Sequence, residues 1–156
     1  MAKKKLKKDI EIINRKAKFE FHFLAEFEVG IILTGTEIKS VRIGEVNMKD
    51  AYCLFQNGEL IIKSLFIAEY KYGNQNNHET RRDRKLLLRK PELRKLEKKV
   101  KEKGFTIVPY KMYIGERGFA KLMIVLGQGK KSYDKRATIK ERDNKRELDR
   151  VKKQYR

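Results

Sequence analysis

The stretch AKFEFHFLAEFEV, residues 17–29, decides the fold of this chain. Its odd-numbered positions are all apolar, and charged or polar side chains occupy most of the positions between them. Alternation of this kind is typical of a strand that buries one face. We therefore predict a long strand over residues 17–29, which Ile31 and Leu33 continue beyond a bulge or bend at Gly30.

Local signals predict a short helix and then a hairpin. Thr36 offers an N-cap oxygen and Gly44 a left-handed stop, so residues 37–43 are predicted to be helical. Beyond this helix, two β-rich runs within residues 51–65 flank the pair Asn57-Gly58. This pair tolerates the positive φ angles of a tight turn, which predicts a β-hairpin.

The second half of the chain begins with a polar stretch, residues 70–83, that predicts an exposed loop. Residues 84–90 are compatible with one or two helical turns. Pro91 suits the first position of a helix that places Leu93, Leu96 and Val100 on one face. Two closing strands are predicted over residues 105–114 and 119–126.

These elements predict a mainly β protein with about three short helices, without the alternation of a parallel sheet. Among small closed or nearly closed antiparallel barrels, the oligonucleotide-binding (OB) type fits best, although strand number alone does not separate it from other small barrels. We expect residues 1–12 to form a basic arm, residues 13–129 the OB-like barrel, and residues 130–156 a basic tail. The tail has too few apolar groups to be ordered alone, and we expect it to become helical on binding a partner.

The charge of the chain indicates the kind of partner. Its 156 residues carry a formal net charge of +19, which repels itself unless a polyanion neutralises it, and a nucleic acid is the leading candidate. No run is long and apolar enough to span a membrane, so we expect a cytoplasmic protein that binds no membrane. A monomer is expected, because no element has an apolar face left over once the barrel is built.

The inventory of reactive side chains argues against catalysis. His22 and His78 are each expected to be ordinary solvated histidines, and Cys53 a small buried hydrophobic residue. Residues 127–131, GQGKK, lack the spacing of a phosphate-binding loop and are expected to be a hinge before the tail. We predict no catalytic residue, no metal site and no cofactor.

Five blocks in order resemble the SsrA-binding protein family, also called small protein B or SmpB. They are NRKA (14–17), EFEVG (26–30), LTGTEIKSVR (33–42), RKLLL (84–88), and GKK with DKR (129–131 and 134–136). The resemblance implies an OB barrel that grips the tRNA-like domain of transfer-messenger RNA (tmRNA, also called SsrA RNA). It also implies binding to stalled ribosomes in trans-translation, with the tail in the empty mRNA channel of the small subunit.

The resemblance also implies site residues. Positions matching Asn14, Glu28, Leu87 and Lys121 are implicated in RNA binding in the family, and Leu87 has an equally good alternative as a core residue. Lys39, Arg42 and the basic pair after residue 129 are suited to phosphate contact. The expected RNA-binding set is Asn14, Lys16, Glu28, Lys39, Arg42, Leu87, Lys121, Lys130 and Lys131. The expected tail residues near the decoding centre of the ribosome are Asp134, Lys135, Arg136, Ile139 and Lys140.

Two other functions fit the composition. The runner-up is a general ribosomal or single-strand RNA-binding OB protein, which would lose its discrimination between RNAs as salt weakens its phosphate contacts. The third is an RNA-modifying or RNA-cleaving enzyme, for which the chain shows no paired nucleophile and base.

Overall fold

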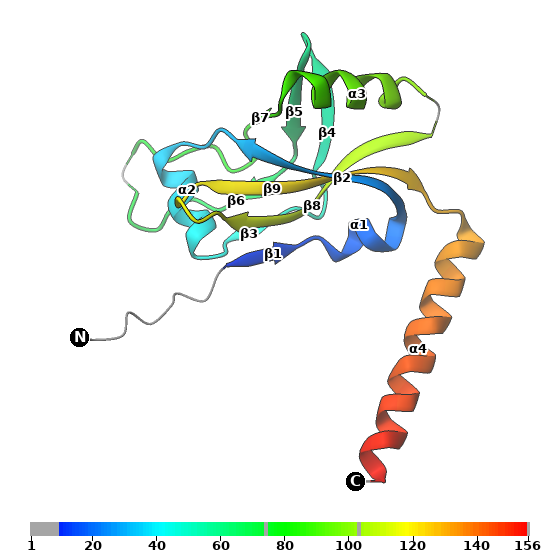
Figure 1. Ribbon diagram of the computed structural model, residues 1–156. Coiled ribbons are helices and arrows are strands. Elements are labelled where there is room, and N and C mark those ends of the chain that lie inside the picture. Colours follow the sequence, from blue (N-terminus) through cyan, green and yellow to red (C-terminus); the bar gives the residue numbers. More distant parts are fainter. Residues whose placement is uncertain (1–9, 74, 103, 156) are drawn as a thin grey trace.

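The computed structural model describes residues 10–73, 75–102 and 104–155. Strands form most of the body, α1, α2 and α3 lie around it, and α4 projects from it (Figure 1). The strands are β1 (Glu11–Ile13), β2 (Phe21–Ile31), β3 (Val46–Asn47), β4 (Tyr52–Gln56), β5 (Glu59–Lys63), β6 (Phe66–Ile67), β7 (Arg84–Leu87), β8 (Phe105–Ile114) and β9 (Ala120–Gly129). The helices are α1 (Arg15–Glu20), α2 (Gly35–Arg42), α3 (Lys90–Val100) and α4 (Ser132–Gln154).

The strand pairings close on themselves. The main sheet has the order β1-β8-β4-β5-β7-β2-β9, and β9 also pairs with β8, so the pairings return to β8 in a ring. Every pairing in the described part of the chain is antiparallel. The prediction of a mainly β, antiparallel protein with a few helices is confirmed.

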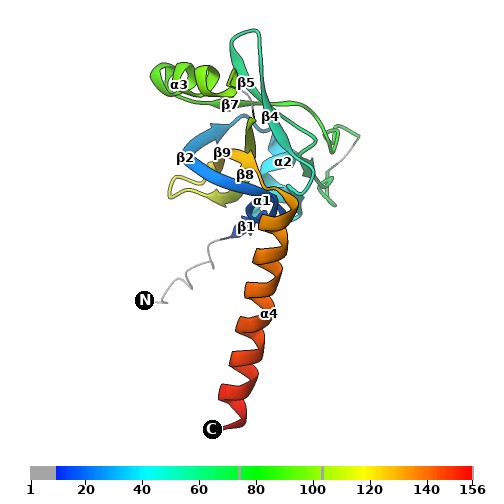
Figure 2. The ribbon, with the colours of Figure 1, turned by 90° about the vertical axis from the view of Figure 1, so that its right-hand side faces the viewer.

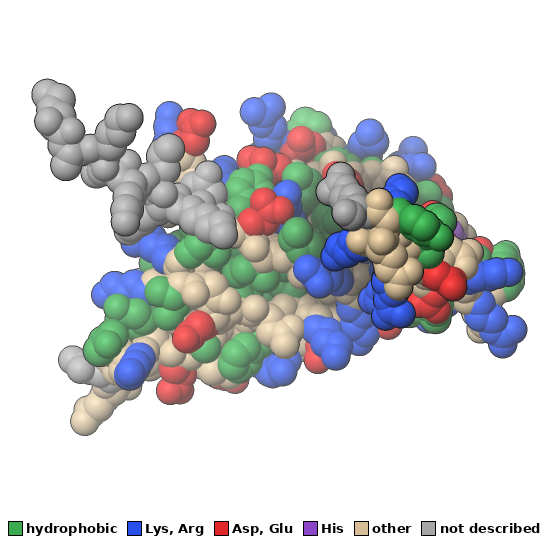
Figure 3. All heavy atoms as spheres, turned by 90° about the horizontal axis from the view of Figure 1, so that it is seen from below, with side chains coloured by type: hydrophobic (Ala, Val, Ile, Leu, Met, Phe, Trp, Pro, Cys, Tyr) green, Lys and Arg blue, Asp and Glu red, His purple; other side chains and the backbone are tan. Residues whose placement is uncertain are grey.

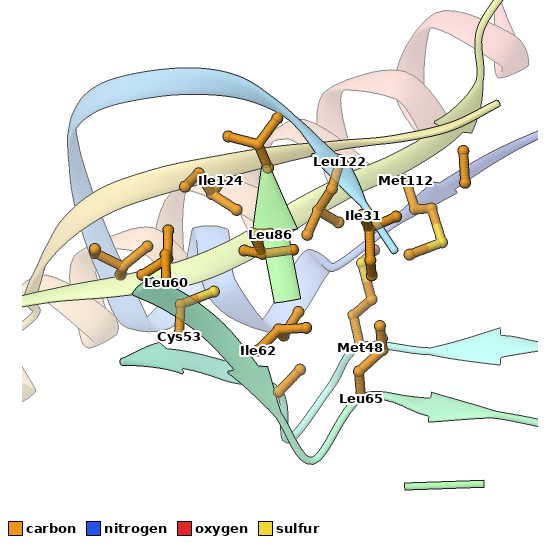
Figure 4. Packing of buried hydrophobic residues seen from close by; sticks show 14 of the residues in the cluster. Ile31, Met48, Cys53, Leu60, Ile62, Leu65, Leu86, Met112, Leu122 and Ile124 are labelled. Atoms are coloured by element: carbon orange, nitrogen blue, oxygen red, sulfur yellow. The ribbon is translucent and has the colours of Figure 1, made fainter. Parts of the chain in front are cut away.

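The core lies inside this ring. Buried apolar side chains from facing strands point toward one another, among them Ile62, Leu86, Met112 and Leu122 (Figure 4). Cys53 belongs to the same cluster and is buried, as the sequence predicts. Burial raises the pKa of its thiol well above the usual range, so the side chain acts as an unreactive apolar group.

The first part of the predicted strand 17–29 is wrong, because residues up to Glu20 belong to helix α1. An apolar residue at every second position also means an apolar residue at every fourth position. Ala17 and Phe21 are four positions apart and can therefore lie on the same side of a helical turn. The side chain of Asn14 accepts a hydrogen bond from the backbone N–H of Ala17 and starts the helix. Ala17 is buried in a small second cluster, against which Phe21 packs.

The bend predicted at Gly30 lies elsewhere. The register of β2 against β9 shifts between Phe23 and Ala25, whereas Gly30 continues the regular pairing. Gly30 instead permits a close approach, because a Cβ there would lie 3.3 Å from the Cβ of Leu87 on β7. The glycine therefore allows β7 to lie close against β2.

Helix α2 begins two residues before its predicted start. Its N-cap is Thr34 instead of Thr36, and the Thr34 backbone N–H donates to the carboxylate of Glu37 at 2.9 Å. The predicted stop is confirmed, since Gly44 has φ +82°. The helix begins earlier than predicted because the Glu37 side chain binds the backbone of Thr34 and makes that residue the cap. A prediction from the N-cap residue alone does not consider this contact.

The hairpin is confirmed, with positive φ angles at both Asn57 and Gly58. Helix α3, which starts one residue before Pro91, and strand β8 are confirmed as well. The helical turns suggested for residues 84–90 are wrong, because Arg84–Leu87 is strand β7, paired with β5 and β2. This short strand alternates buried and more exposed residues over four positions, too few to show a period by themselves.

The end of the body also differs from the expectation. Strand β9 continues to Gly129, so residues 127–129 are not a hinge. A Cβ at Gly127 would lie 3.0 Å from the Cβ of Phe21, and this glycine therefore makes room for the strand beside it. The predicted arm, residues 1–12, lies mostly outside the described residues, and its last two residues belong to β1.

Candidate nucleic-acid interface

A depression on the outer face of the sheet brings three of the expected RNA-binding residues together. Gly30 pairs with Lys121 of β9 on one side and with Leu87 of β7 on the other. A hollow of about 500 Å³ borders Gly30 and these two neighbours. Its lining, which we call the β2 depression, is Glu28, Gly30, Leu87, Leu88, Arg89, Glu92 and Lys121.

The chemistry of the β2 depression is mixed. Leu87 is 51% exposed, which excludes the alternative of a core residue. Lys121 and Arg89 can contact phosphates, whereas the Glu28 carboxylate can accept hydrogen bonds from the N–H groups of exposed base edges. Such a combination suits a folded RNA with accessible bases better than a uniform duplex backbone.

Tyr113 of β8, which was not predicted as a site residue, donates a hydrogen bond from its hydroxyl to the carboxylate of Glu28. Burial raises the pKa of Tyr113 to about 12, with a further contribution from the hydrogen bond to Glu28, so the phenol keeps its proton near neutral pH. The only signal in the sequence is the alternation of Lys111 and Tyr113 about the buried Met112. The hydrogen bond between Tyr113 and Glu28 could be predicted only from the register of the three strands β2, β9 and β8.

Asn14 and Lys16 lie apart from this depression. The buried amide of Asn14 donates to the carbonyl oxygens of Met48 at 3.1 Å and Pro109 at 2.9 Å, so it ties the start of α1 to strand β8 and to the segment after β3. The ammonium of Lys16 lies 3.5 Å from the carboxylate of Asp50. For both residues the RNA contact stays a prediction, while the structure gives Asn14 an internal role.

The basic residues of α2 form a separate surface. Arg42 donates to the carbonyl oxygen of Gly118 at 3.3 Å and, with Arg117, borders a hollow of about 290 Å³ that shares no residue with the β2 depression. The ammonium of Lys39 lies 5.3 Å from the centre of the Tyr70 ring. A second contact area is thus available beside α2.

A buried polar network fixes α2 to β7 and to the loop that precedes it. Both Arg82 and Arg84 donate to the Glu37 carboxylate, at 2.9 to 3.0 Å, and all three side chains lie in or at the edge of the core. Burial by itself raises the pKa of Glu37, but the hydrogen bonds from Arg82 and Thr34 and the charge of Arg84 outweigh it and hold that pKa below its usual range. This network has no local signal in the sequence, because Glu37 lies 45 and 47 positions from its two arginine partners.

His78 belongs to the same region, and the expectation that it is solvated is wrong. It is buried, with Nδ1 2.8 Å from the hydroxyl of Thr36 and Nε2 2.9 Å from the carbonyl oxygen of Ile67. A polar sequence predicts exposure on average, but here both ring nitrogens find hydrogen-bond partners outside the loop, on α2 and β6.

The tail residues lie on or just before α4, which projects from the body (Figure 2). Its start is held to β2, since Nε2 of His22 lies 3.3 Å from the carboxylate of Asp134. Further along α4, the Arg142 guanidinium lies 5.5 Å from the ring of Phe19 on α1. Lys130 precedes the helix and its ammonium lies 3.4 Å from the hydroxyl of Thr138. The remaining expected residues are Lys131, at the N-cap, and Lys135, Arg136, Ile139 and Lys140, none of which is buried.

The free tail was expected to be disordered, whereas the structure gives it as a helix; disorder without a partner stays a prediction. No residue of Ser132–Gln154 is buried. Seen from below in Figure 3, Lys and Arg side chains are spread across this face, with apolar and acidic side chains between them. Such a surface is suited to contact with a polyanion.

Metal sites and membrane-spanning helices are two further classes of feature. Within residues 10–73, 75–102 and 104–155, no three His, Cys, Asp or Glu side chains are placed to hold a metal ion. The helices in these ranges include none that is long and apolar enough to cross a membrane.

Comparison with known proteins decides the family. A family model described as "SmpB protein" matches residues 11–154. The chain belongs to the SmpB family. An SsrA-binding protein of Parabacteroides distasonis is 52% identical over 149 residues, covering 96% of this chain and 97% of the relative. The SsrA-binding protein of Phocaeicola vulgatus is 54% identical over 142 residues, covering 91% and 95%.

A solved structure agrees with this membership. A chain from a study described as "tmRNA-SmpB: a journey to the center of the bacterial ribosome" superposes with a TM-score of 0.67 at 46% sequence identity. The match covers 78% of the present chain and 85% of that chain. The resemblance inferred from the five sequence blocks is confirmed.

Proposed function

We propose that this chain binds the tRNA-like domain of tmRNA and delivers it to stalled ribosomes for trans-translation. The observation that carries the proposal is the β2 depression, in which Glu28, Leu87 and Lys121 meet from three strands of an SmpB-family protein. The protein acts by binding alone, as a non-enzymatic cytoplasmic monomer without a cofactor.

We assign a separate role to each of the three parts of the chain. Residues 13–129 form an RNA-binding domain of OB type, supported by the closed ring of antiparallel pairings. Residues 1–12 add a basic arm, and residues 130–156 a basic tail. Within the domain, the β2 depression reads base edges and backbone, while Lys39 and Arg42 contact phosphates from α2.

The tail occupies the empty mRNA channel of the small subunit. With twelve Lys and Arg against five Asp and Glu after residue 126, it is suited to a channel lined by ribosomal RNA. Its helix buries no residue of its own, so contacts with the ribosome supply the stabilisation that the isolated helix lacks. Asp134, Lys135, Arg136, Ile139 and Lys140 act nearest the decoding centre.

The test compares the intact chain with a version that ends at Lys131. This end is chosen because the backbone N–H of Lys130 donates to the Glu20 carbonyl oxygen at 2.7 Å, a bond that an earlier end would remove. Binding to the tRNA-like domain and to an unrelated hairpin is measured across a salt series, together with rescue of stalled ribosomes.

We expect both proteins to prefer the tRNA-like domain at raised salt, and only the intact chain to rescue ribosomes. Equal binding to both RNAs, weakening together as salt rises, would show a general RNA binder. Product formation from labelled RNA would reveal an enzyme.

A further inference from the structure

An exposed group of aromatic and basic side chains lies outside the β2 depression. Tyr72 is 76% exposed, and its ring packs edge-to-face against that of Tyr70 with 5.7 Å between their centres. The ammonium of Lys39 lies 5.3 Å from the Tyr70 ring centre, and that of Lys71 lies 5.8 Å from the Tyr72 ring centre. We call Lys39, Tyr70, Lys71 and Tyr72 the aromatic platform.

The platform is held by its own loop. The side-chain amide of Asn77 accepts from the Tyr70 N–H at 3.2 Å and donates to the Tyr70 carbonyl oxygen at 2.9 Å. The N–H of Gly73 donates to that same carbonyl at 2.8 Å and closes a tight turn around Tyr72. Further along the loop, the buried ring of His78 contacts α2 and β6. Tyr72 is thus presented to solvent from an ordered turn, which lowers the entropy lost on binding.

The platform lies far from the tail, so it can contact a different part of the RNA or ribosome than the tail does. Its loop extends beyond α2, at the opposite end of the body from the start of α4 (Figure 1). No platform residue lines the β2 depression. Exposed Glu69 and Glu79 lie in the same loop and partly offset its lysines, so charge alone does not account for the surface.

We propose that the aromatic platform stacks an unpaired nucleobase of the tRNA-like domain of tmRNA. The inference rests on the proposed function, because it takes that RNA as the partner. Tyrosine faces stack on any base, and a nearby ammonium can contact the phosphate that flanks it. A duplex would offer phosphates but no free base face, which would leave Tyr72 without a role.

The test uses the full-length chain and the transcribed tRNA-like domain across a salt series. Tyr72→Leu keeps an apolar side chain and removes the aromatic face, while Tyr72→Phe keeps the face and removes the hydroxyl. Tyr52→Leu is the matched control, since Tyr52 is 44% exposed on β4 and is not part of the platform. Lys71→Gln removes one charge.

We expect Tyr72→Leu to weaken binding roughly 5- to 50-fold, in line with alanine substitutions at base-stacking aromatics, without changing the salt dependence. Tyr72→Phe and Tyr52→Leu should bind like the parent. Lys71→Gln should lower the slope of log affinity against log salt by about 1.

Two results would contradict the proposal that the platform stacks a nucleobase. Either Tyr72→Leu binds the RNA like the parent, or Tyr72→Phe binds as weakly as Tyr72→Leu, which would show a hydroxyl contact instead of stacking. Glu28→Gln in the same assay keeps the two proposals apart. If it weakens binding while Tyr72→Leu does not, the platform fails and the proposed function stands; if the parent itself does not prefer the tRNA-like domain, the proposed function fails as well.

Discussion

The hydroxyl of Tyr113 on β8 donates a hydrogen bond to the carboxylate of Glu28 on β2, across the intervening strand β9. This bond restricts the Glu28 side chain while leaving acceptor positions on its carboxylate for a ligand, since an ionised carboxyl has about four lone-pair sites. Tyr113 is therefore a positioning residue for Glu28 within the proposed RNA site.

Removing this hydroxyl should weaken RNA binding. We expect Tyr113→Phe to lower affinity for the tRNA-like domain about 2- to 10-fold, the range of one hydrogen bond, with an unchanged melting temperature. Glu28→Gln and the double variant complete a cycle measured by titration with labelled RNA. Strictly additive effects would contradict coupling between the two residues.

Adjacent leucines on β7 should separate stability from binding. Leu86 is 3% exposed and belongs to the core, whereas Leu87 is 51% exposed at the β2 depression. We expect Leu86→Ala to cost about 2–5 kcal/mol of unfolding free energy and Leu87→Ala less than about 0.5 kcal/mol. In RNA titrations the order reverses, with Leu87→Ala the weaker binder. Normal RNA affinity for Leu87→Ala would remove this residue from the site.

Much of the fold was predictable because its signals are local. The Asn57-Gly58 turn, the Gly44 stop and the apolar face of α3 are each encoded within a few residues. The start of α1 was not, because apolar positions two and four apart fit a strand and a helical turn alike, and the Asn14 cap decides between them.

The candidate site was also predictable only in part. Family resemblance supplied Glu28, Leu87 and Lys121, but only the strand register shows that they meet around Gly30. Tyr113 lies 85 positions from Glu28, so their bond leaves no trace in any local pattern. The Glu37 network also depends on loops whose positions follow from the whole fold.

The contact between Asp134 and His22 should hold the first turn of α4 against β2. We expect Asp134→Ala to free the first turn of α4 from β2, because it removes both this contact and the hydrogen bond from the Lys131 N–H. Hydrogen exchange at residues 135–138 should rise, and rescue of stalled ribosomes should fall, while affinity for the tRNA-like domain is unchanged. Asp143→Ala, further along α4, is the control. Equal exchange in both variants would show that Asp134 does not hold the helix.

The buried Glu37 carboxylate should make stability depend on acid pH. Its pKa is below the usual value in the folded protein, so its ionised form stabilises the fold above the unfolded-state pKa of about 4.3, and that contribution is lost as pH falls through the folded pKa. We expect Glu37→Gln to cost about 3–5 kcal/mol at pH 7, because it leaves Arg84 buried without its charge partner. The difference from the parent should shrink as the pH falls below 4.

Denaturant unfolding at a series of pH values from 3 to 7 measures this effect. The control is Glu59→Gln, since Glu59 pairs with Lys85 at 2.6 Å on the surface, where both side chains are 41% exposed or more. An exposed pair contributes little, so this variant should lose less than about 1 kcal/mol at any pH. If Glu37→Gln and the parent lose stability in parallel on acidification, another carboxyl group is responsible for the acid sensitivity.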